Sequence, residues 1–394
     1  MKKRITFFAF AAALAFCYSC SNDETVASQA TSESNEISFR PLMNNMTRAT
    51  DAALGTTGSF KVTAFAAGNT TGTPYIDEVT FTGASGTYTS GDKYYWPANN
   101  GLLDFYAWSP VSVSAGDSNY DGFTITPSTT VSEQIDLIYA VTKGWGKTTK
   151  SGSNGVAINF RHAESKIKFM VSNSNPNLKI TVGTVTIKNL HGTETFTWNG
   201  VTDGSTTTAA SSADTDGKFT IGTLTRLNGS WTATSAKTAS YTTPAMSAGA
   251  SYNLLNGTTA AKNLYDDTNE TAPSYDMILI PQELDVATAY PSNGGTFSKA
   301  CILVQLKIQN IDGTYILGSA GDFITAMWPL TALTWLPGHM YTYTIDLAGG
   351  GYYETDQDND SVLDPILEGA VINFVTVTVD DWADGGAGGV YVGS

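Results

Sequence analysis

The sequence predicts an all-β protein built from β-sandwich domains, and three observations support this class. No segment carries sustained helical periodicity, whereas apolar and polar residues alternate with period two over many short stretches. Gly, Asn, Asp and Pro bound these stretches and mark turns. Thr is abundant throughout, and its β-branched side chain suits an extended backbone. Many short strands separated by turn signals are typical of sandwiches.

The length and charge of the chain limit its domain count and its partners. With 394 residues and a hydrophobic share of 41%, the chain can bury two cores of ordinary size. Its 36 acidic residues outnumber the 21 Lys and Arg, and the net charge is −15. Because this balance repels a phosphate backbone, we exclude nucleic acid as a partner, and the same argument disfavours docking on an anionic bilayer.

Residues 1–20 have the pattern of an export signal. A short positive start precedes an apolar stretch, Ile5 to Phe16, which is too short to span a bilayer as a helix. Ser19 is a small residue directly before Cys20, whereas the bulky residue before Cys17 would obstruct cleavage there. The segment resembles a bacterial lipoprotein signal, and we expect the lipid to be attached to Cys20.

Residues 21–35 are predicted to form a flexible tether, because they are mostly small and polar. The tether begins Ser21-Asn22-Asp23-Glu24, which resembles the acidic export signal that sends lipoproteins of the Bacteroidetes to the outer face of the outer membrane. A solvated acidic tether without that role is the alternative. We therefore expect a surface-exposed location at the cell outer membrane.

The rest of the chain divides into two predicted domains, residues 36–175 and residues 176–394. The boundary follows from the breaker cluster Asn173-Ser174-Asn175-Pro176-Asn177. A polar, Gly-containing stretch from Asp203 to Gly217 is predicted to be an exposed loop of the second domain. The expected strands are residues 60–65, 102–108, 122–126, 136–140, 156–160, 166–171, 180–187, 193–198, 277–280, 302–308, 340–347 and 371–379.

The residues that usually carry catalysis form no recognisable motif. His162, His191 and His339 lack zinc-ligand spacing, and the sequence has neither a Gly-x-Ser-x-Gly elbow nor a phosphate loop. Each His is predicted to be a hydrogen-bonded structural residue. Cys301 stands in an apolar run, which indicates a buried thiol rather than a reactive one. We expect no enzymatic activity and no cofactor.

One acidic cluster has the spacing of a weak calcium candidate. Asp356, Asp358 and Asp360 place carboxylates at alternate positions, with Asp364 beyond them, and calcium takes six to eight oxygen ligands. The cluster departs from the EF-hand loop, since Ser361 stands where that loop requires Gly and no Glu stands at the twelfth position. A solvated acidic loop without a metal is the favoured interpretation.

Seven short phrases, most of them rich in aromatic residues, follow one another over roughly residues 36 to 382. Each phrase is unspecific alone, and the order and spacing of the set carry the information. The phrases are Tyr94 to Pro97, Leu103 to Pro110, Asp136 to Ala140, Phe160 to Ile167, Trp335 to Tyr343, Ile372 to Phe374 and Val377 to Trp382.

In this order the phrases resemble the fimbrillins, the subunits of the type V pilus of Bacteroidetes. The resemblance implies two transthyretin-like Greek-key β-sandwich domains in tandem. It also implies export as a lipoprotein, removal of an N-terminal segment by an arginine-specific protease, and polymerisation by donor-strand exchange. In that mechanism, loss of the first strand opens a groove that a strand of a neighbouring subunit fills by β-augmentation.

The sequence offers residues for the processing steps that the resemblance implies. Ile37 and Phe39 alternate with polar neighbours and are expected to belong to the first strand, which maturation removes. Arg48 lies in a Thr- and Asn-rich stretch that a protease could enter, whereas Arg40 precedes a proline and resists cleavage. We expect processing at Arg48; an ordinary loop residue is the alternative.

Two segments are candidates for the donor strand. Val375, Val377 and Val379 share one face of a predicted strand, which could equally belong to the subunit's own domain. Val390 and Val392 follow a Gly-rich hinge. Both candidates remain open, and so does the place of the subunit in the filament: an anchor should keep its lipid and lack the cleavage, and a tip should lack a donor.

The sequence therefore predicts a structural pilus subunit with a role in adhesion. Its expected partners are other pilus subunits, the outer membrane through its lipid, and a host surface reached through the filament. The alternative is a monomeric surface lipoprotein that binds glycans through exposed aromatic side chains. Core packing is the favoured role for the tryptophans in or beside predicted strands, which are Trp96, Trp108, Trp328, Trp335 and Trp382.

Overall fold

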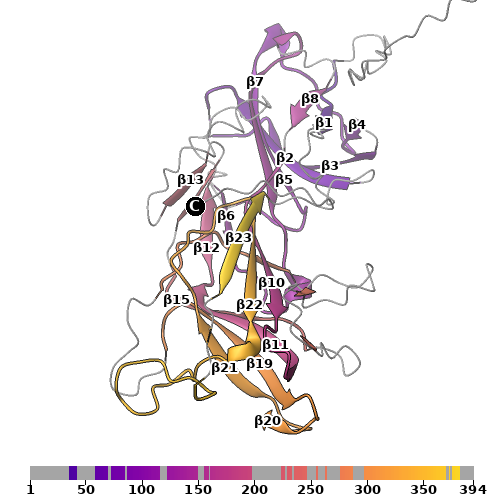
Figure 1. Cartoon of the computed structure of the whole chain (residues 1–394). Coiled ribbons are helices and arrows are strands. Elements are labelled where there is room, and N and C mark those ends of the chain that lie inside the picture. Colours follow the sequence, from indigo (N-terminus) through magenta and orange to yellow (C-terminus); the bar gives the residue numbers. More distant parts are fainter. Residues whose placement is uncertain are drawn as a thin grey trace, which may run out of the picture. The chain divides into compact units, whose positions relative to one another are not determined.

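A computed structural model of the chain is shown in Figure 1. The structure describes residues 35–41, 58–69, 72–84, 87–115, 122–149, 155–158, 160–197, 223–226, 229–232, 235–245, 254–255, 262–263, 276–286, 297–369, 372 and 375–381. Within these ranges the regular elements are strands and three short 3-10 helices, Ala98–Asn100, Val131–Glu133 and Leu347–Gly349.

The largest sheet consists, in this order, of β8 (Val156–Ile158), β1 (Phe39–Pro41), β4 (Thr87–Thr89), β3 (Ile76–Ala84), β2 (Gly58–Ala66), β5 (Leu103–Ser109), β7 (Ile138–Trp145) and β9 (Arg161–His162). β1 is parallel to β8 and antiparallel to β4. Every residue of β5 is buried, because alternate side chains enter two different cores: Phe105 lies in one and Tyr106 in the other. Short alternating stretches thus build a sheet that is covered on both faces at its centre.

A five-stranded sheet consists of β17 (Lys262–Asn263), β10 (Ser165–Ser172), β22 (His339–Asp346) and β23 (Thr376–Asp381), with β18 (Met277–Leu279) also paired to β10. β10 and β22 are parallel, and β23 is antiparallel to β22. Along β10 buried and half-buried residues alternate strictly, as the Lys-Ile-Lys-Phe-Met-Val pattern predicts. Its buried side chains, such as Phe169, enter the core of the C-terminal half.

A six-stranded antiparallel sheet consists of β15 (Lys237–Thr242), β11 (Leu178–His191), β19 (Cys301–Asn310) and β20 (Tyr315–Leu317), with β16 (Leu254–Leu255) on β11 and β21 (Ile324–Pro329) on β19. β11 and β19 form the longest ladder of this sheet, from Leu178 opposite Asn310 to Lys188 opposite Cys301. This sheet and the five-stranded sheet share one hydrophobic core, to which β11 contributes Ile180 and β10 contributes Ile167.

A four-stranded sheet consists of β13 (Thr223–Arg226), β14 (Gly229–Thr232), β12 (Glu194–Thr197) and β6 (Gly122–Ile125). β6 pairs with β12, so that residues about 70 positions apart lie side by side, with Phe123 opposite Phe196. Trp231 packs on Phe196, and its indole N–H donates to the carbonyl of Ala163, 2.6 Å away. This sheet therefore joins strands from both predicted halves of the chain.

The predicted all-β class is confirmed. The described residues contain no α-helix, and strands occupy the alternating stretches in every part of the chain that the structure describes. Within those residues no helix is long and apolar enough to cross a membrane. The boundary after residue 175 stays a prediction; β10 lies before it and pairs with β18 and β22, which lie after it. The predicted loop at Asp203–Gly217 lies outside the described residues.

Candidate functional site

The first strand of the described chain lies inside a sheet rather than at its edge. β1 pairs with β8 on one side and with β4 on the other, and Phe39 stands opposite Val156 and Tyr88. Within the part of the chain that the structure describes, β1 is the sole ladder partner of β8. Removing β1 would therefore leave two strand edges without partners on either side of one gap.

Backbone hydrogen bonds hold the residues around β1 along their whole length. Ile37 N donates to the carbonyl of Tyr94 at 2.7 Å, and Trp96 N donates to the carbonyl of Asn35 at 2.9 Å. On the other side, Val156 N donates to the carbonyl of Ser38 at 2.8 Å. The segment from residue 35 to residue 41 is thus bound as a strand over a greater length than β1 alone.

The side chains of Ile37 and Phe39 enter the core, as their alternation predicts. Their exposed fractions are 2% and 1%. The ring of Phe39 makes edge-on contacts with three other rings, at centroid distances of 4.6 Å to Phe81, 5.3 Å to Phe105 and 6.0 Å to Phe60. Edge-to-face contacts between aromatic rings stabilise the fold beyond the free energy that burial of the rings provides. Phe39 therefore fills the centre of an aromatic core that β2, β3 and β5 provide.

A glycine in the left-handed backbone conformation leads into β8. Gly155 has φ of +89°, a conformation that favours glycine. A Cβ there would lie 3.4 Å from Ser38 Oγ and 3.6 Å from Arg40 Cγ. Arg40 Nε donates to the Gly155 carbonyl at 3.2 Å. The residue before β8 thus needs glycine for its backbone conformation, and its carbonyl accepts a hydrogen bond from the side chain of Arg40 in β1.

The other residues predicted for processing fall outside the described ranges. These are Cys20, Arg48 and the second donor candidate, Val390 and Val392. β1 ends at residue 41 and β2 begins at Gly58, so Arg48 belongs to the connection between them. Cleavage at Arg48 would separate β1 covalently from the strands that surround it.

The first donor candidate lies in and before an edge strand. β23 lies beside β22 (Figure 1), and its residues Val377 and Val379 stand opposite Tyr343 and Tyr341. Both are half-buried against the C-terminal core, and Val375 is 7% exposed. Within the described residues β23 pairs with no strand besides β22. The valines thus cover the core of their own chain; whether they also serve as a donor strand stays a prediction.

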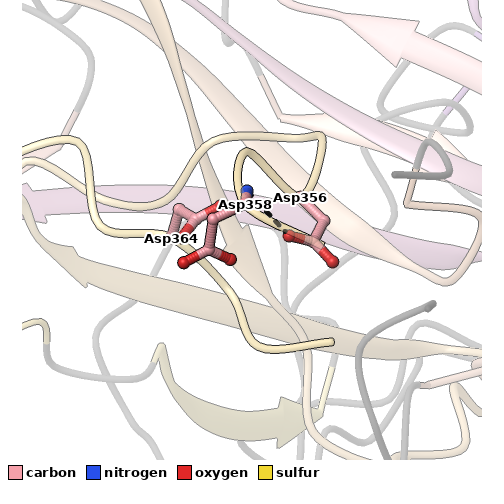
Figure 2. A group of neighbouring side chains, drawn as sticks. All are labelled: Asp356, Asp358 and Asp364. Atoms are coloured by element: carbon pink, nitrogen blue, oxygen red, sulfur yellow. Dashed lines mark hydrogen bonds between the residues drawn. The ribbon is translucent and has the colours of Figure 1, made fainter. Parts of the chain in front are cut away.

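The acidic loop brings three of its four predicted ligands together. Carboxylate oxygens of Asp356, Asp358 and Asp364 lie within 4.8 Å of one another (Figure 2), and Asp360 is not part of this group. Asp356 is 6% exposed and accepts hydrogen bonds from the backbone N–H groups of Asp358, Asn359 and Ser361. These bonds organise the loop, and calcium binding stays the untested alternative to a solvated acidic loop.

Sequence reasoning missed Glu164, which is buried where the first sheet leads into β10. Its carboxylate accepts from Leu137 N at 2.9 Å, and its carbonyl accepts from Gly338 N at 2.7 Å. Burial raises the pKa of Glu164 well above its usual value; the Leu137 N–H opposes this shift and the Asp136 carboxylate adds to it. The phrase Phe160 to Ile167 contained the residue, but no local pattern predicted its burial.

A Ser, a His and a Glu also meet, but not as a catalytic relay. His191 Nδ1 lies 3.0 Å from Glu194 Oε1, and Ser235 Oγ donates to the same Glu194 oxygen at 2.8 Å. A nucleophilic triad needs the hydroxyl and the carboxylate on different ring nitrogens. Burial lowers the pKa of His191, which Glu194 partly opposes. The arrangement therefore stabilises a turn.

Two further histidines are hydrogen-bonded, and Cys301 and four of the named tryptophans are buried, as the sequence predicts. His162 Nδ1 lies 2.9 Å from Asp136 Oδ1, and His339 Nδ1 lies 2.9 Å from the Pro337 carbonyl. Cys301 is fully buried, and burial raises the pKa of its thiol to about 12. Four of the named tryptophans are buried, and Trp382 lies outside the described residues; the four are Trp96, Trp108, Trp328 and Trp335.

The fold and the site together define an all-β protein whose short first strand completes its N-terminal core. Comparison with protein families then gives the particular family. The family model described as "Fimbrillin-like" matches residues 47–382, and the chain belongs to this family. Membership supports a structural role as a pilus or adhesion subunit at the cell surface.

The chain is also similar to solved structures. The chain is similar to a fimbrial protein from Bacteroides vulgatus, with 13% identity, 89% of this chain and 100% of that chain covered, and a TM-score of 0.50. It also matches a fimbrilin from Porphyromonas gingivalis, with 11% identity, 89% and 98% of the two chains covered, and a TM-score of 0.40. No curated protein matches the chain.

Proposed function

We propose that the chain is a structural subunit of a fimbria that is exported as a lipoprotein, processed at Arg48 and polymerised by strand exchange. The observation that carries this proposal is the position of β1, a short buried strand between β8 and β4. A strand in that place can be replaced only by another strand that makes the same two ladders. Membership of the fimbrillin-like family agrees with such a role.

The covalent connection explains why proteolysis would start assembly. While residues 42–57 join β1 to β2, the first strand has a high effective concentration at its own site, and a strand from another chain competes poorly. Cleavage after Arg48 turns the intramolecular contact into a bimolecular one. A neighbouring subunit can then displace the released segment, and burial of its apolar side chains drives the exchange.

The lipid and the donor complete the proposed sequence of events. A lipid on Cys20 would hold the precursor at the outer membrane, and loss of residues 1–48 would release the subunit from that anchor. The donor strand would come from the valine face Val375, Val377 and Val379, or from Val390 and Val392. The partners are other pilus subunits, and a host surface that the filament contacts.

Limited proteolysis of the purified full chain tests the proposal. We expect a trypsin-like protease to cut after Arg48, and the cut protein to form ladders that resist detergent and filaments visible by electron microscopy. The matched control is Arg48→Ala, which should stay uncut in this connection and monomeric. Uncut wild-type protein, or cut protein that never assembles even with purified filament seeds, would contradict the proposed maturation.

The alternative, a glycan-binding monomer, requires exposed aromatic side chains. All six tryptophans in the described residues are at most 4% exposed, and they are Trp96, Trp108, Trp145, Trp231, Trp328 and Trp335. Tyr75 and Tyr95 are 43% and 48% exposed, and Tyr75 Oη donates to the Tyr95 carbonyl at 2.6 Å. Glycan-array binding by the monomer that is lost in Tyr95→Ala would favour this alternative.

A further inference from the structure

The site that Phe39 occupies is shaped for an aromatic ring. Phe81, Phe105 and Phe60 surround that ring edge-on, and 1% of the residue is exposed. A valine at this position would leave part of the volume empty and would lose the contacts between rings. The surrounding side chains come from three strands of one sheet, so the gap could not close without moving the sheet.

The site two residues earlier is also apolar but has a different shape. Ile37 is 2% exposed and belongs to the same core, whereas Ser38 between the two sites is half-buried on the opposite face. Glu36 points its carboxylate to Lys93 at the surface, 3.0 Å away. The inward-facing pattern of the first strand is therefore a branched aliphatic residue and an aromatic residue two positions apart.

The two ladders also fix the direction of the strand. β1 runs parallel to β8 and antiparallel to β4, and these two types of ladder space their hydrogen bonds differently. A strand inserted in the opposite direction would have to form an antiparallel ladder with β8 and a parallel ladder with β4. The backbone groups of these two strands are positioned for the reverse arrangement. The site therefore distinguishes both the side chains and the direction of its occupant.

We propose that this site selects its occupant by sequence: it accepts an extended Ile-x-Phe segment of a neighbouring subunit that runs parallel to β8. Phe39 marks the position that determines specificity. The inference rests on the proposed function and narrows the identity of the donor, because a face that carries only valines at alternate positions fills the Phe39 site poorly.

Within this sequence the required pattern stands directly before β23. Ile372-Asn373-Phe374 repeats the sequence pattern of Ile37-Ser38-Phe39. In its own chain Ile372 is half-buried against the core that Val375, Val377 and Val379 also contact. The segment Val390-Tyr391-Val392 offers valines at the two positions instead. Of the two donor candidates, a second copy of this chain would thus donate through the first, with residues 372–374 in the site, rather than through Val390 and Val392.

Binding of synthetic peptides to the full chain tests the proposal without any cleavage at Arg48. In the variant Phe39→Ala the chain's own first strand is weakened, so that an added strand can compete for the site. The probes are peptides with the sequences of residues 35–41, 371–376 and 388–394. We expect the first two to raise the melting temperature of the variant and the third to leave it unchanged.

Two altered peptides serve as matched controls. The peptide 35–41 with Phe39→Val should bind about 30-fold more weakly than its parent, as expected for a large-to-small change in a packed core. The peptide with the reversed sequence has the same composition and should not bind. If Phe39→Ala does not fold, Phe39→Leu takes its place with the same peptides.

The outcomes separate this inference from the proposed function. Equal binding of the peptides with Phe and with Val, or binding of the reversed peptide, would overturn the sequence selectivity. No effect of the 35–41 peptide on either variant would also overturn it, because the site would then accept no strand in trans. Failure of cleavage or filament formation would contradict the proposed maturation alone.

Discussion

β1 and β23 are both short strands with alternating apolar residues, yet the fold uses them differently. β1 lies between two strands, and the side chains of Phe39 and of Ile37, two residues before it, are almost completely buried. β23 lies at the edge of the described part of its sheet, and Val377 and Val379 are only half-buried. A strand between two neighbours completes a core, whereas an edge strand covers one. Strands with similar local sequence patterns therefore contribute differently to the free energy of unfolding.

The largest effect is expected for the strand in the interior. Phe39→Ala should lower the free energy of unfolding by about 3 to 5 kcal/mol, because it empties a closed aromatic site. Urea denaturation followed by tryptophan fluorescence measures the change. Ser38→Ala, on the opposite face of the same strand, is the control and should cost less than about 1 kcal/mol. Equal effects of the two variants would remove the distinction between β1 and an edge strand.

A smaller effect is expected at Glu164, which follows β9 of the first sheet and directly precedes β10 of the sheet that contains β23. Because the folded pKa lies well above the usual 4.5, the stability from the neutral carboxyl is complete below that pH and is lost as the pH rises through the folded pKa. Glu164→Gln keeps an acceptor for Leu137 N–H and cannot ionise. It should raise the free energy of unfolding at pH 8 by about 1 to 2 kcal/mol.

The pH dependence of that gain provides the check. The gain should vanish near pH 4, where the wild-type carboxyl of Glu164 is neutral as well. The same substitution at an exposed position, Glu133→Gln, is the matched control. Hydrogen exchange of the backbone amides of β1 and β23, recorded for the wild type and for Glu164→Gln at pH 8, shows whether the two strands open together. Equal slowing at both strands indicates one cooperative transition, and slowing at one strand alone indicates two. A gain of the same size at pH 4 and pH 8 would contradict a raised pKa.

The edge strand should respond more weakly than β1. Val377→Ala removes two methyl groups from a half-buried site and should cost about 1 kcal/mol, measured by the same denaturation. Thr378→Ala, exposed on the other face of β23, is the matched control and should cost less. A loss at Val377 as large as the loss at Phe39 would mean that β23 completes its core as β1 does.

The smallest effect is expected in the acidic loop that precedes β23. Asp358 is exposed, and Asp358→Asn should change the free energy of unfolding by less than about 0.5 kcal/mol. Calcium at millimolar concentration should leave the melting temperature of the wild type unchanged. A rise of several degrees with calcium that is absent in the variant would instead establish a metal site formed by Asp356, Asp358 and Asp364.

The strands themselves were predictable because side-chain alternation is a local signal. The pattern around Phe169 predicted β10, and that around Val62 predicted β2. The same signal predicted that Ile37 and Phe39 face inward. It could not predict the burial of both faces of β5, since that depends on two cores built from residues far away in the sequence.

The residues that occupy the candidate site could be predicted from the sequence, but the side chains that surround them could not. The sequence named Ile37 and Phe39, but the aromatic rings that receive Phe39 come from positions 60, 81 and 105, and alternation does not pair strands. The burial of Glu164 likewise depends on Leu137, which precedes it in the sequence, and on Gly338, which follows it at a long distance along the chain. Partners of this kind are brought together only by the sheet order.

By itself, the sequence determined the all-β class, the inward face of its alternating strands and the resemblance to fimbrillins, because each depends on residue types and short spacings. The tertiary structure decided that the first strand lies between β8 and β4, that it runs parallel to one and antiparallel to the other, and that β23 lies at an edge. The physical reason is that strand pairing is a contact between distant segments. Its direction and register are set by the whole sheet and by the core that the sheet must cover.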